Sequence, residues 1–141
     1  MPQPIPPAFL DLLTEKLAVA HFATINPDGT PQISPVWVDY EDGYILINGK
    51  VDRIKDRNVH QNPAVAVSVP DPENPFRYLA IQGRVVEIID DVDREHIDRL
   101  IRKYTNEPGF TGSYEPGQMR RIYKIEPTHV FAASKPNRNK Q

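Results

Sequence analysis

Apolar and polar residues alternate in short runs along most of the chain, which is the pattern of strands with one buried face. Other stretches repeat apolar residues at a spacing of three and four, which is the pattern of amphipathic helices. The predicted strands are residues 18–25, 30–40, 44–48, 64–69, 76–89 and 119–133, the last interrupted at Glu126-Pro127. The predicted helices are a short one that opens at Pro7, a second over residues 52–61 and a third from Asp90-Asp91 to about Tyr104. The third has a predicted apolar face of Ile97, Leu100, Ile101 and Tyr104.

The connections between these elements are short and contain turn-forming residues. Residues 26–29 and 41–43 separate the first three strands, which are therefore predicted to form an antiparallel meander. Residues 70–75 are predicted as a loop, and Gly83 inside a strand indicates a β-bulge or a close backbone approach. Six mostly sequential strands and three helices predict a mainly β fold with flanking helices, arranged as a small β-barrel.

Composition narrows the class of protein. A length of 141 residues fits one domain over residues 1–141, with loose ends expected at 1–7 and 135–141. Hydrophobic and charged contents of 39% and 26% are typical of a soluble globular protein. The sequence shows neither an apolar run long enough to cross a membrane nor a basic-then-apolar leader, so a cytoplasmic location is expected.

Charge and residue usage exclude several kinds of site. The chain contains no cysteine, which leaves no disulfide framework and no thiolate zinc site. Its four histidines are scattered without metal-ligand spacing, so no metal site is predicted. A net charge of −2 argues against general nucleic-acid binding. A local cluster of cations in such a chain therefore indicates a small anionic ligand.

The most informative segment is residues 48–58, where Lys50, Arg53, Lys55 and Arg57 follow a predicted strand. The segment passes from that strand into the start of a predicted helix. Backbone N–H groups at a helix N-terminus are unsatisfied donors in a positive field, and Arg and Lys add further donors. We interpret the segment as a phosphate site; the alternative is a solvated basic helix.

Four segments together resemble the pyridoxamine 5'-phosphate oxidase-like split barrels. No single segment is decisive, but their order and spacing match over nearly the whole chain, from about Phe9 to Ala133. The segments are Gly29–Trp37, Arg53-x-Lys55-x-Arg57-Asn58-x-x-x-Asn62-Pro63, Tyr78-x-x-Ile81-x-Gly83-x-Val85 and Pro127-Thr128-His129-Val130. The second segment is most similar to F-420-dependent flavin/deazaflavin oxidoreductases of the B type.

This resemblance implies a homodimeric, FMN-binding-like split β-barrel with the cofactor in the groove between subunits. The implied cofactor is the deazaflavin coenzyme F-420, with FMN as its rival, and the implied activity is hydride transfer to or from a small conjugated organic substrate. Because such cofactors carry the hydride chemistry themselves, no catalytic residue of the chain is expected. By position, the resemblance implies twelve cofactor-binding residues. They are Arg53, Lys55 and Arg57 near the phosphate with Asn58 of the same motif, Asn48, Gly49 and Lys50 at the ring edge, Gln32, Ser34 and Pro35 in the ring pocket, and Phe76 and Tyr78 on the groove wall, from the same or the second subunit.

Other interpretations stay open. An FMN-dependent oxidoreductase and a non-catalytic carrier of flavin or deazaflavin both fit the same barrel. Trp37 suits the floor of a substrate pocket or the barrel core equally, and His129 suits a donor near the ring or a structural residue. Asp52 and Asp56 depart from an all-basic phosphate site, and we interpret them as helix-start residues that pair with arginine.

Overall fold

The computed structural model describes residues 1–107 and 119–135. In these residues the strands are β1 (Ala20–Ile25), β2 (Pro31–Val36), β3 (Asp39–Glu41), β4 (Tyr44–Lys50), β5 (Ala64–Asp71), β6 (Asn74–Asp90) and β7 (Arg120–Ala133). The helices are a short 3-10 turn η1 (Pro7–Phe9), α1 (Asp11–Thr14), α2 (Ile54–Gln61) and α3 (Glu95–Thr105). The prediction of a mainly β protein with flanking helices is confirmed.

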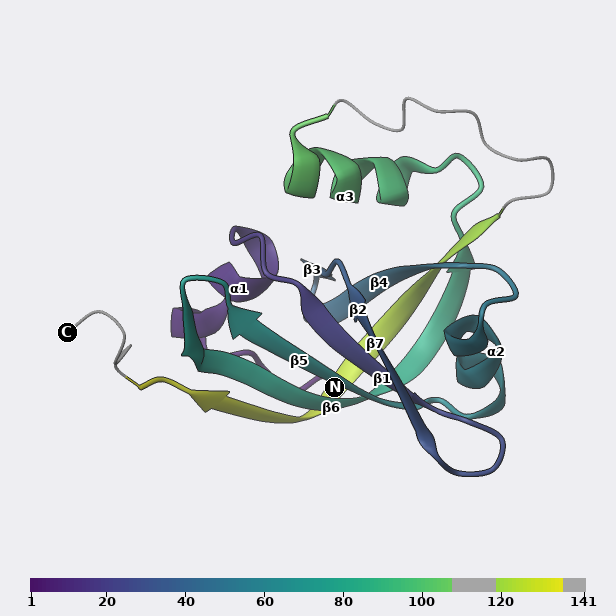
Figure 1. The fold of residues 1–141 in the computed structure, drawn as a ribbon, viewed down its shortest axis with the longest axis horizontal. Coiled ribbons are helices and arrows are strands. Elements are labelled where there is room, and N and C mark those ends of the chain that lie inside the picture. The colour runs from purple at the N-terminus through teal and green to yellow at the C-terminus, as the bar shows by residue number, and fades with distance from the viewer. Residues whose placement is uncertain (108–118, 136–141) are drawn as a thin grey trace.

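The described strands form a single antiparallel sheet in the order β2-β1-β5-β6-β7-β4-β3. Its two edge strands, β2 and β3, follow one another in sequence with Trp37 and Val38 between them. A two-residue connection cannot cross the width of a sheet, so the sheet has to curl until its edges meet. This closure is the split barrel that the resemblance implied (Figure 1).

One sequence prediction about the first strands is wrong. The strand expected over residues 30–40 is broken at Trp37-Val38, where the chain turns from β2 on one edge to β3 on the other. Both antiparallel pairings of the expected meander are present, β1 with β2 and β3 with β4, but the corner places the two hairpins at the two edges of the sheet, where β1 also pairs with β5 and β4 with β7. Local alternation cannot reveal such a corner, since both halves continue the same pattern.

Gly83 in β6 and Pro127 in β7 shift the register between the two strands without ending either strand. Strand β7 runs on through Glu126-Pro127, and the register against β6 shifts at Gly83, which lies opposite Pro127. A Cβ on Gly83 would come within 2.7 Å of Ile125 Cγ2 and 3.0 Å of the Glu126 carbonyl oxygen. Both the bulge and the close approach predicted at Gly83 are confirmed. The loop expected over residues 70–75 is shorter, because β5 and β6 extend into it as a hairpin.

Apolar side chains from the sheet and from α1 fill the barrel. The largest fully buried side chains include Tyr123, Phe22, Leu12, Leu13, Ile45 and Ile47. The N-terminal segment, expected to be loose, packs onto this barrel instead: Ile5 is buried in the core and the Gln3 backbone N–H donates to the Pro127 carbonyl. Ile5 lies between two prolines, which explains why the segment is ordered. Burial of the isoleucine side chain stabilises the packed segment, and the prolines reduce the backbone entropy that is lost on ordering it. Residues 108–117 and most of 135–141 lie outside the described residues.

The three helices lie at different places around the barrel (Figure 1). Helix α2 sits beside the end of β4, and α3 lies over the β2–β3 corner, where the Tyr104 hydroxyl accepts from the Val38 N–H and donates to the Ala18 carbonyl. The predicted apolar face of α3 is confirmed, with Ile97 and Leu100 buried. None of the described helices is long and apolar enough to span a membrane.

A buried carboxylate fastens α2 to the sheet. Asp56 is 1% exposed and accepts from the Tyr123 hydroxyl at 2.7 Å, from Arg121 Nη1 at 2.8 Å and from the Asp52 backbone N–H at 3.0 Å. The Tyr123 ring reaches Asp56 by passing over Gly49, where a Cβ would lie 2.5 Å from the phenol oxygen. Gly49 is therefore needed for close packing inside the barrel as well as for any approach of a ligand.

We expect Tyr123→Phe to destabilise the fold by about 1–3 kcal/mol, because Asp56 would lose a donor while remaining buried. Chemical denaturation of the two proteins measures this difference. Tyr44→Phe is the matched control, since no described residue hydrogen-bonds to the Tyr44 hydroxyl, and it should leave stability unchanged. Equal stability of Tyr123→Phe and the parent protein would contradict the role of Asp56.

Candidate functional site

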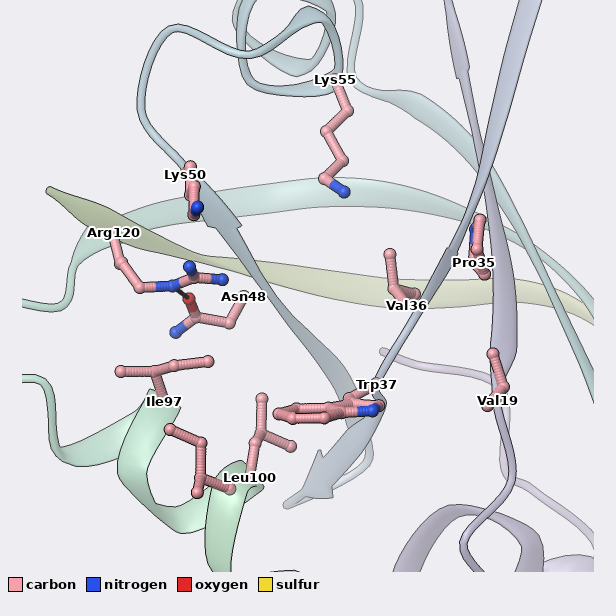
Figure 2. Close-up of a pocket in the computed structure, with 11 residues that line it drawn as sticks. Val19, Pro35, Val36, Trp37, Asn48, Lys50, Lys55, Ile97, Leu100 and Arg120 are labelled. Atoms are coloured by element: carbon pink, nitrogen blue, oxygen red, sulfur yellow. Dashed lines mark hydrogen bonds between the residues drawn. The ribbon is translucent and has the colours of Figure 1, made fainter. Parts of the chain in front are cut away.

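A groove with two lobes lies between β2, β4, α2 and α3. One lobe, called the polar lobe, has a volume of about 550 Å³ and is lined mostly by polar and charged residues, and the other, the apolar lobe, has a volume of about 560 Å³ and a mostly apolar surface. Lys50, Lys55 and Arg120 line both lobes and join them into one site (Figure 2). The polar lobe adds Gln32, Ser34, Gly49, Asp52, Arg53, Ile54 and Arg57. The apolar lobe adds Val19, Pro35, Val36, Trp37, Asn48, Ile97, Leu100 and Ile101.

Strand alternation and the helix start place the cations. In β4, Ile47 is buried in the core and Gly49 faces Tyr123, so Asn48 and Lys50 point to the opposite face. The backbone then turns at Asp52, which has a positive φ of 69°, and α2 begins at Ile54. Lys55 therefore lies in the first turn of α2, facing Lys50 across the groove (Figure 2).

The charge of Lys55 is poorly compensated. Burial of its side chain and the neighbouring charges of Arg120 and Arg53 all lower the pKa of Lys55 below its usual range. Within residues 1–107 and 119–135 it makes no ion pair with a carboxylate. A half-buried lysine among cations is unfavourable by itself and becomes favourable when an anion enters.

The two aspartates of this segment do not neutralise the cluster. Asp56 points beneath α2 to Tyr123 and Arg121, away from the groove, as the interpretation of a helix-start residue paired with arginine anticipated. Asp52 is exposed and lines the polar lobe, but its carboxylate forms no ion pair among the described residues, so the arginine pair expected for it is not found; its backbone N–H donates to Asp56. The cationic face of the segment is thus separated from its acidic partner by the helix itself.

Ser34 supplies a second indication of a missing ligand. Among the described residues, its Oγ is the one buried side-chain nitrogen or oxygen atom without a hydrogen-bond partner, and Ser34 lines the polar lobe. Buried hydroxyl groups in proteins nearly always have a partner. A ligand oxygen or ring nitrogen in this lobe would satisfy it.

A chain of hydrogen bonds holds Asn48 at the centre of the groove. Its amide NH₂ lies 3.1 Å from Asp91 Oδ2 and 3.0 Å from His96 Nδ1, and its Oδ1 accepts from Arg120 Nε at 2.6 Å. Because His96 Nδ1 accepts from the amide, the ring proton sits on Nε2 and is donated to Asp39 Oδ2 at 3.1 Å.

Asp39 remains a carboxylate acceptor at the end of this chain. Burial acts to raise the pKa of Asp39, but hydrogen bonds from His96 and the Tyr40 backbone and the charge of Arg99 lower it to about 2. The Asp91 side chain also accepts from the backbone N–H groups of His96 and Ile97, and so ties the start of α3 to this centre. Asn48 is thereby held in one orientation between β4 and α3.

Most residues predicted for the site lie in this groove, and three do not. Gln32, Ser34, Pro35, Asn48, Gly49, Lys50, Arg53, Lys55 and Arg57 line one lobe or both. The Asn58 side chain is buried instead, and donates to Thr24 Oγ1 and Asn26 Oδ1 to hold α2 against β1. Phe76 and Tyr78 lie on the first half of β6, where Tyr78 contacts Phe131, and they line neither lobe.

Sequence reasoning missed Arg120 and the wall provided by α3. Arg120 pairs with Lys50 in the β4–β7 register, 70 positions later in the chain, and no local pattern marks that partnership. Ile97, Leu100 and Ile101 were predicted as a buried helix face, and the structure shows that this face also bounds the apolar lobe. Trp37 lines the lobe and is partly exposed, so it belongs to the pocket rather than to the core.

Comparisons with known proteins agree with this architecture. Residues 5–133 match the family model described as pyridoxamine 5'-phosphate oxidase. A solved structure named F420 reductase is 34% identical, with a TM-score of 0.80 over 90% of this chain and 98% of its own. Conserved hypothetical protein Rv2991 from Mycobacterium tuberculosis is 20% identical, with a TM-score of 0.69 over 92% of this chain and 85% of its own.

A third structure, General Stress Protein 26 from Bacillus anthracis, is 15% identical, with a TM-score of 0.63 over 89% of this chain and 90% of its own. The likeness to these last two shows the shared fold alone. No curated protein sequence matches the chain. The family match covers the sheet, both lobes of the groove and α3, and the chain belongs to the pyridoxamine 5'-phosphate oxidase family.

Proposed function

We propose that the protein is an oxidoreductase that binds a flavin or deazaflavin in the two-lobed groove, and that the cofactor is F-420. The observation that carries this proposal is Lys55, half-buried beside Arg120 and Arg53 with no carboxylate partner among the described residues. Family membership and the likeness to a structure named F420 reductase support it. Without a bound anion, the repulsion among these cations and the burial of Lys55 would only destabilise the fold.

The residues present fit such a cofactor. Lys55, Arg53 and Arg57 would bind the phosphate, with Arg as bidentate and Lys as point-charge donor. Ser34 Oγ and the Gln32 amide would hydrogen-bond the polar edge of the ring system, and Pro35 would pack against it. When bound, F-420 supplies the hydride chemistry itself.

The role of the protein is then to hold the cofactor in place and to shield it from water. The network around Asn48 keeps the groove in one geometry before a ligand enters, which lowers the entropy lost on binding. We assign no catalytic acid or base to the chain. The described residues contain no group of three His, Cys, Asp or Glu side chains arranged for a metal ion.

A second copy of the chain completes the proposed site. The outer face of β1, β2, β5, β6 and β7 carries small residues such as Ala23, Ala66 and Ala80, flanked by Ile33 and Phe131, and is hollowed by about 430 Å³. Ile33 and Phe131 are 63% and 59% exposed, which is unusual for large apolar side chains on one continuous face. A homodimer through this face would cover them. Phe76 and Tyr78, on the adjoining part of β6, would then reach the partner's groove. His129 lines the same face, and we assign it to the interface.

FMN is the second candidate cofactor, and the polar lobe is the observation that favours it. Its cations surround one compact volume, which suits a single phosphate. F-420 carries a longer acidic tail that needs positive charge beyond the first phosphate, and the exposed Arg53 and Arg57 offer the start of such a path. A non-catalytic carrier would bind either cofactor without turnover.

We expect Lys55→Ala to weaken cofactor binding by about 1.5–3 kcal/mol, the range for a hydrogen bond to a charged group. Titration of the purified protein with F-420 and with FMN measures the loss. Thermal stability should not fall, because the lysine charge is uncompensated in the free protein. The matched control is Lys124→Ala, whose ammonium lies over the Tyr44 ring at 4.3 Å, outside the groove.

The same titration at several pH values gives a second readout. The pKa of Lys55 is lowered in the free protein, and the anion needs its charged form. Affinity should therefore fall as pH rises through the lowered pKa, before ordinary lysines lose their charge, and Lys55→Ala should lack this component. Unchanged affinity of Lys55→Ala for both cofactors would place the phosphate elsewhere.

We expect F-420 to bind more tightly than FMN, with a stronger salt dependence because more charges are neutralised. Titrations with each cofactor at two salt concentrations compare them. Oxidation of reduced F-420 by a quinone- or enone-like acceptor in the presence of the protein then measures turnover. Tight FMN binding without F-420 binding would favour the second candidate, and F-420 binding without turnover with any such acceptor would favour a carrier.

We expect sedimentation at micromolar concentration to show a dimer. Ile33→Lys would put two like charges into the proposed interface and should shift the protein to monomer. Val92→Lys, which changes an exposed valine that lines neither that face nor the groove, is the control and should remain dimeric. A stable parent monomer would contradict the proposed interface.

A further inference from the structure

The apolar lobe extends beyond the residues assigned to the phosphate and the ring edge of the cofactor. Its far wall is formed by Ile97, Leu100 and Ile101 of α3, and its floor by Trp37. Ile97, Leu100 and Trp37 lie on the side of Asn48 opposite Lys50 and Lys55 (Figure 2). A cofactor placed on the basic segment would leave this part of the groove for a second molecule.

Trp37 is held as a flat platform. Its ring stacks on Tyr104 with centroids 5.1 Å apart and planes 7° apart. The Tyr104 hydroxyl is fixed by the Val38 N–H at 3.2 Å and the Ala18 carbonyl at 2.7 Å. Lys103 lies over the Tyr104 ring at 4.9 Å and donates to the Val38 carbonyl at 2.9 Å. One face of the indole is thus covered by a rigid support.

The other face of the indole is turned towards the cavity. In Figure 2 the ring is seen edge-on, with Asn48 and Lys55 on one side of its plane and Leu100 beside its edge. Burying one face of tryptophan while the second lines an apolar cavity suits a planar conjugated ring, because stacked aromatic rings gain energy beyond area burial. The cationic side of the cavity suits an oxygen that carries or gains negative charge.

We infer that the apolar lobe is a substrate subsite in which Trp37 stacks on a planar conjugated ring bearing a carbonyl or carboxylate oxygen directed at the cationic side of the groove. That the bound molecule is a substrate rests on the proposed function. The binding itself depends only on the geometry of the lobe. Trp37 is then a specificity-determining residue, selecting flat molecules over puckered ones of equal charge.

The chain contains one tryptophan, so its fluorescence reports on this subsite directly. The probe is 2-naphthoate, which is flat, anionic and unreactive, and its partner is decahydro-2-naphthoate, which has the same charge and carbon skeleton without aromatic rings. Added to the protein without cofactor, 2-naphthoate should change the Trp37 emission saturably and bind about threefold to tenfold more tightly than its partner in calorimetry. No saturable change in emission, or equal affinity for the two probes, would overturn the inference.

Two variants separate stacking from folding. Trp37→Leu should remove the preference for 2-naphthoate, and Trp37→Phe should keep part of it. Ile101→Phe leaves the platform intact and fills the lobe, so it should exclude both probes while the melting temperature stays close to that of the parent protein. Retained preference in Trp37→Leu, or unchanged binding in Ile101→Phe, would contradict the subsite.

Repeating the calorimetry with cofactor bound distinguishes this inference from the proposed function. Simultaneous binding of 2-naphthoate and cofactor supports a substrate subsite beside the cofactor. Mutual exclusion would show that the cofactor itself occupies the apolar lobe, and would overturn the inference while leaving the proposed function intact. If the protein binds 2-naphthoate selectively but binds neither F-420 nor FMN, the proposed function and the substrate role are both wrong. The lobe would then still be a binding site for flat rings.

Discussion

The groove depends on one buried carboxylate. The Asp56 carboxylate is buried beneath α2. It is stabilised there by hydrogen bonds from the Tyr123 hydroxyl, the Arg121 guanidinium and the Asp52 backbone N–H. A buried charge with several donors is stable in one geometry and costly in others. The carboxylate therefore fixes the start of α2 relative to β4 and β7. The cations of α2 are positioned by that attachment together with the hydrogen bonds from Asn58 to Thr24 and Asn26.

The same arrangement separates opposite charges that are adjacent in the sequence. Lys55 and Asp56 are neighbours, yet Asp56 faces the sheet and Lys55 faces the groove. A helix turns by about 100° per residue, so consecutive side chains point in different directions. The result is a positive face with little internal compensation. That lack of compensation favours binding of an anion over stability of the free protein, a trade-off common at functional sites.

On the other side of the groove, Asn48 plays a comparable role for α3. Its amide meets Asp91 and His96, and its carbonyl oxygen meets Arg120, so one side chain connects β4, β7 and the helix that walls the apolar lobe. Tyr104 adds a second attachment at the β2–β3 corner. The groove is thus supported by Asp56 beneath the basic segment and by Asn48 and Tyr104 beside the apolar lobe, while Arg120, which donates to Asn48, lines both lobes.

The sequence by itself determined most of the strands and helices and the basic segment, because alternation, turns and local charge are properties of neighbouring residues. Resemblance over the whole length supplied the family, the barrel and the other predicted residues that line the groove. What only the tertiary structure decided are the pairings between distant positions: the corner at Trp37-Val38, Lys50 beside Arg120, and Asn48 between His96 and Arg120. Asn58 carries the same motif signal as Lys55, yet its side chain turns inward to Thr24 because the helix presents it to β1. Which face of an element meets which neighbour is set by closure of the sheet, and closure is a property of the whole chain that no local pattern contains.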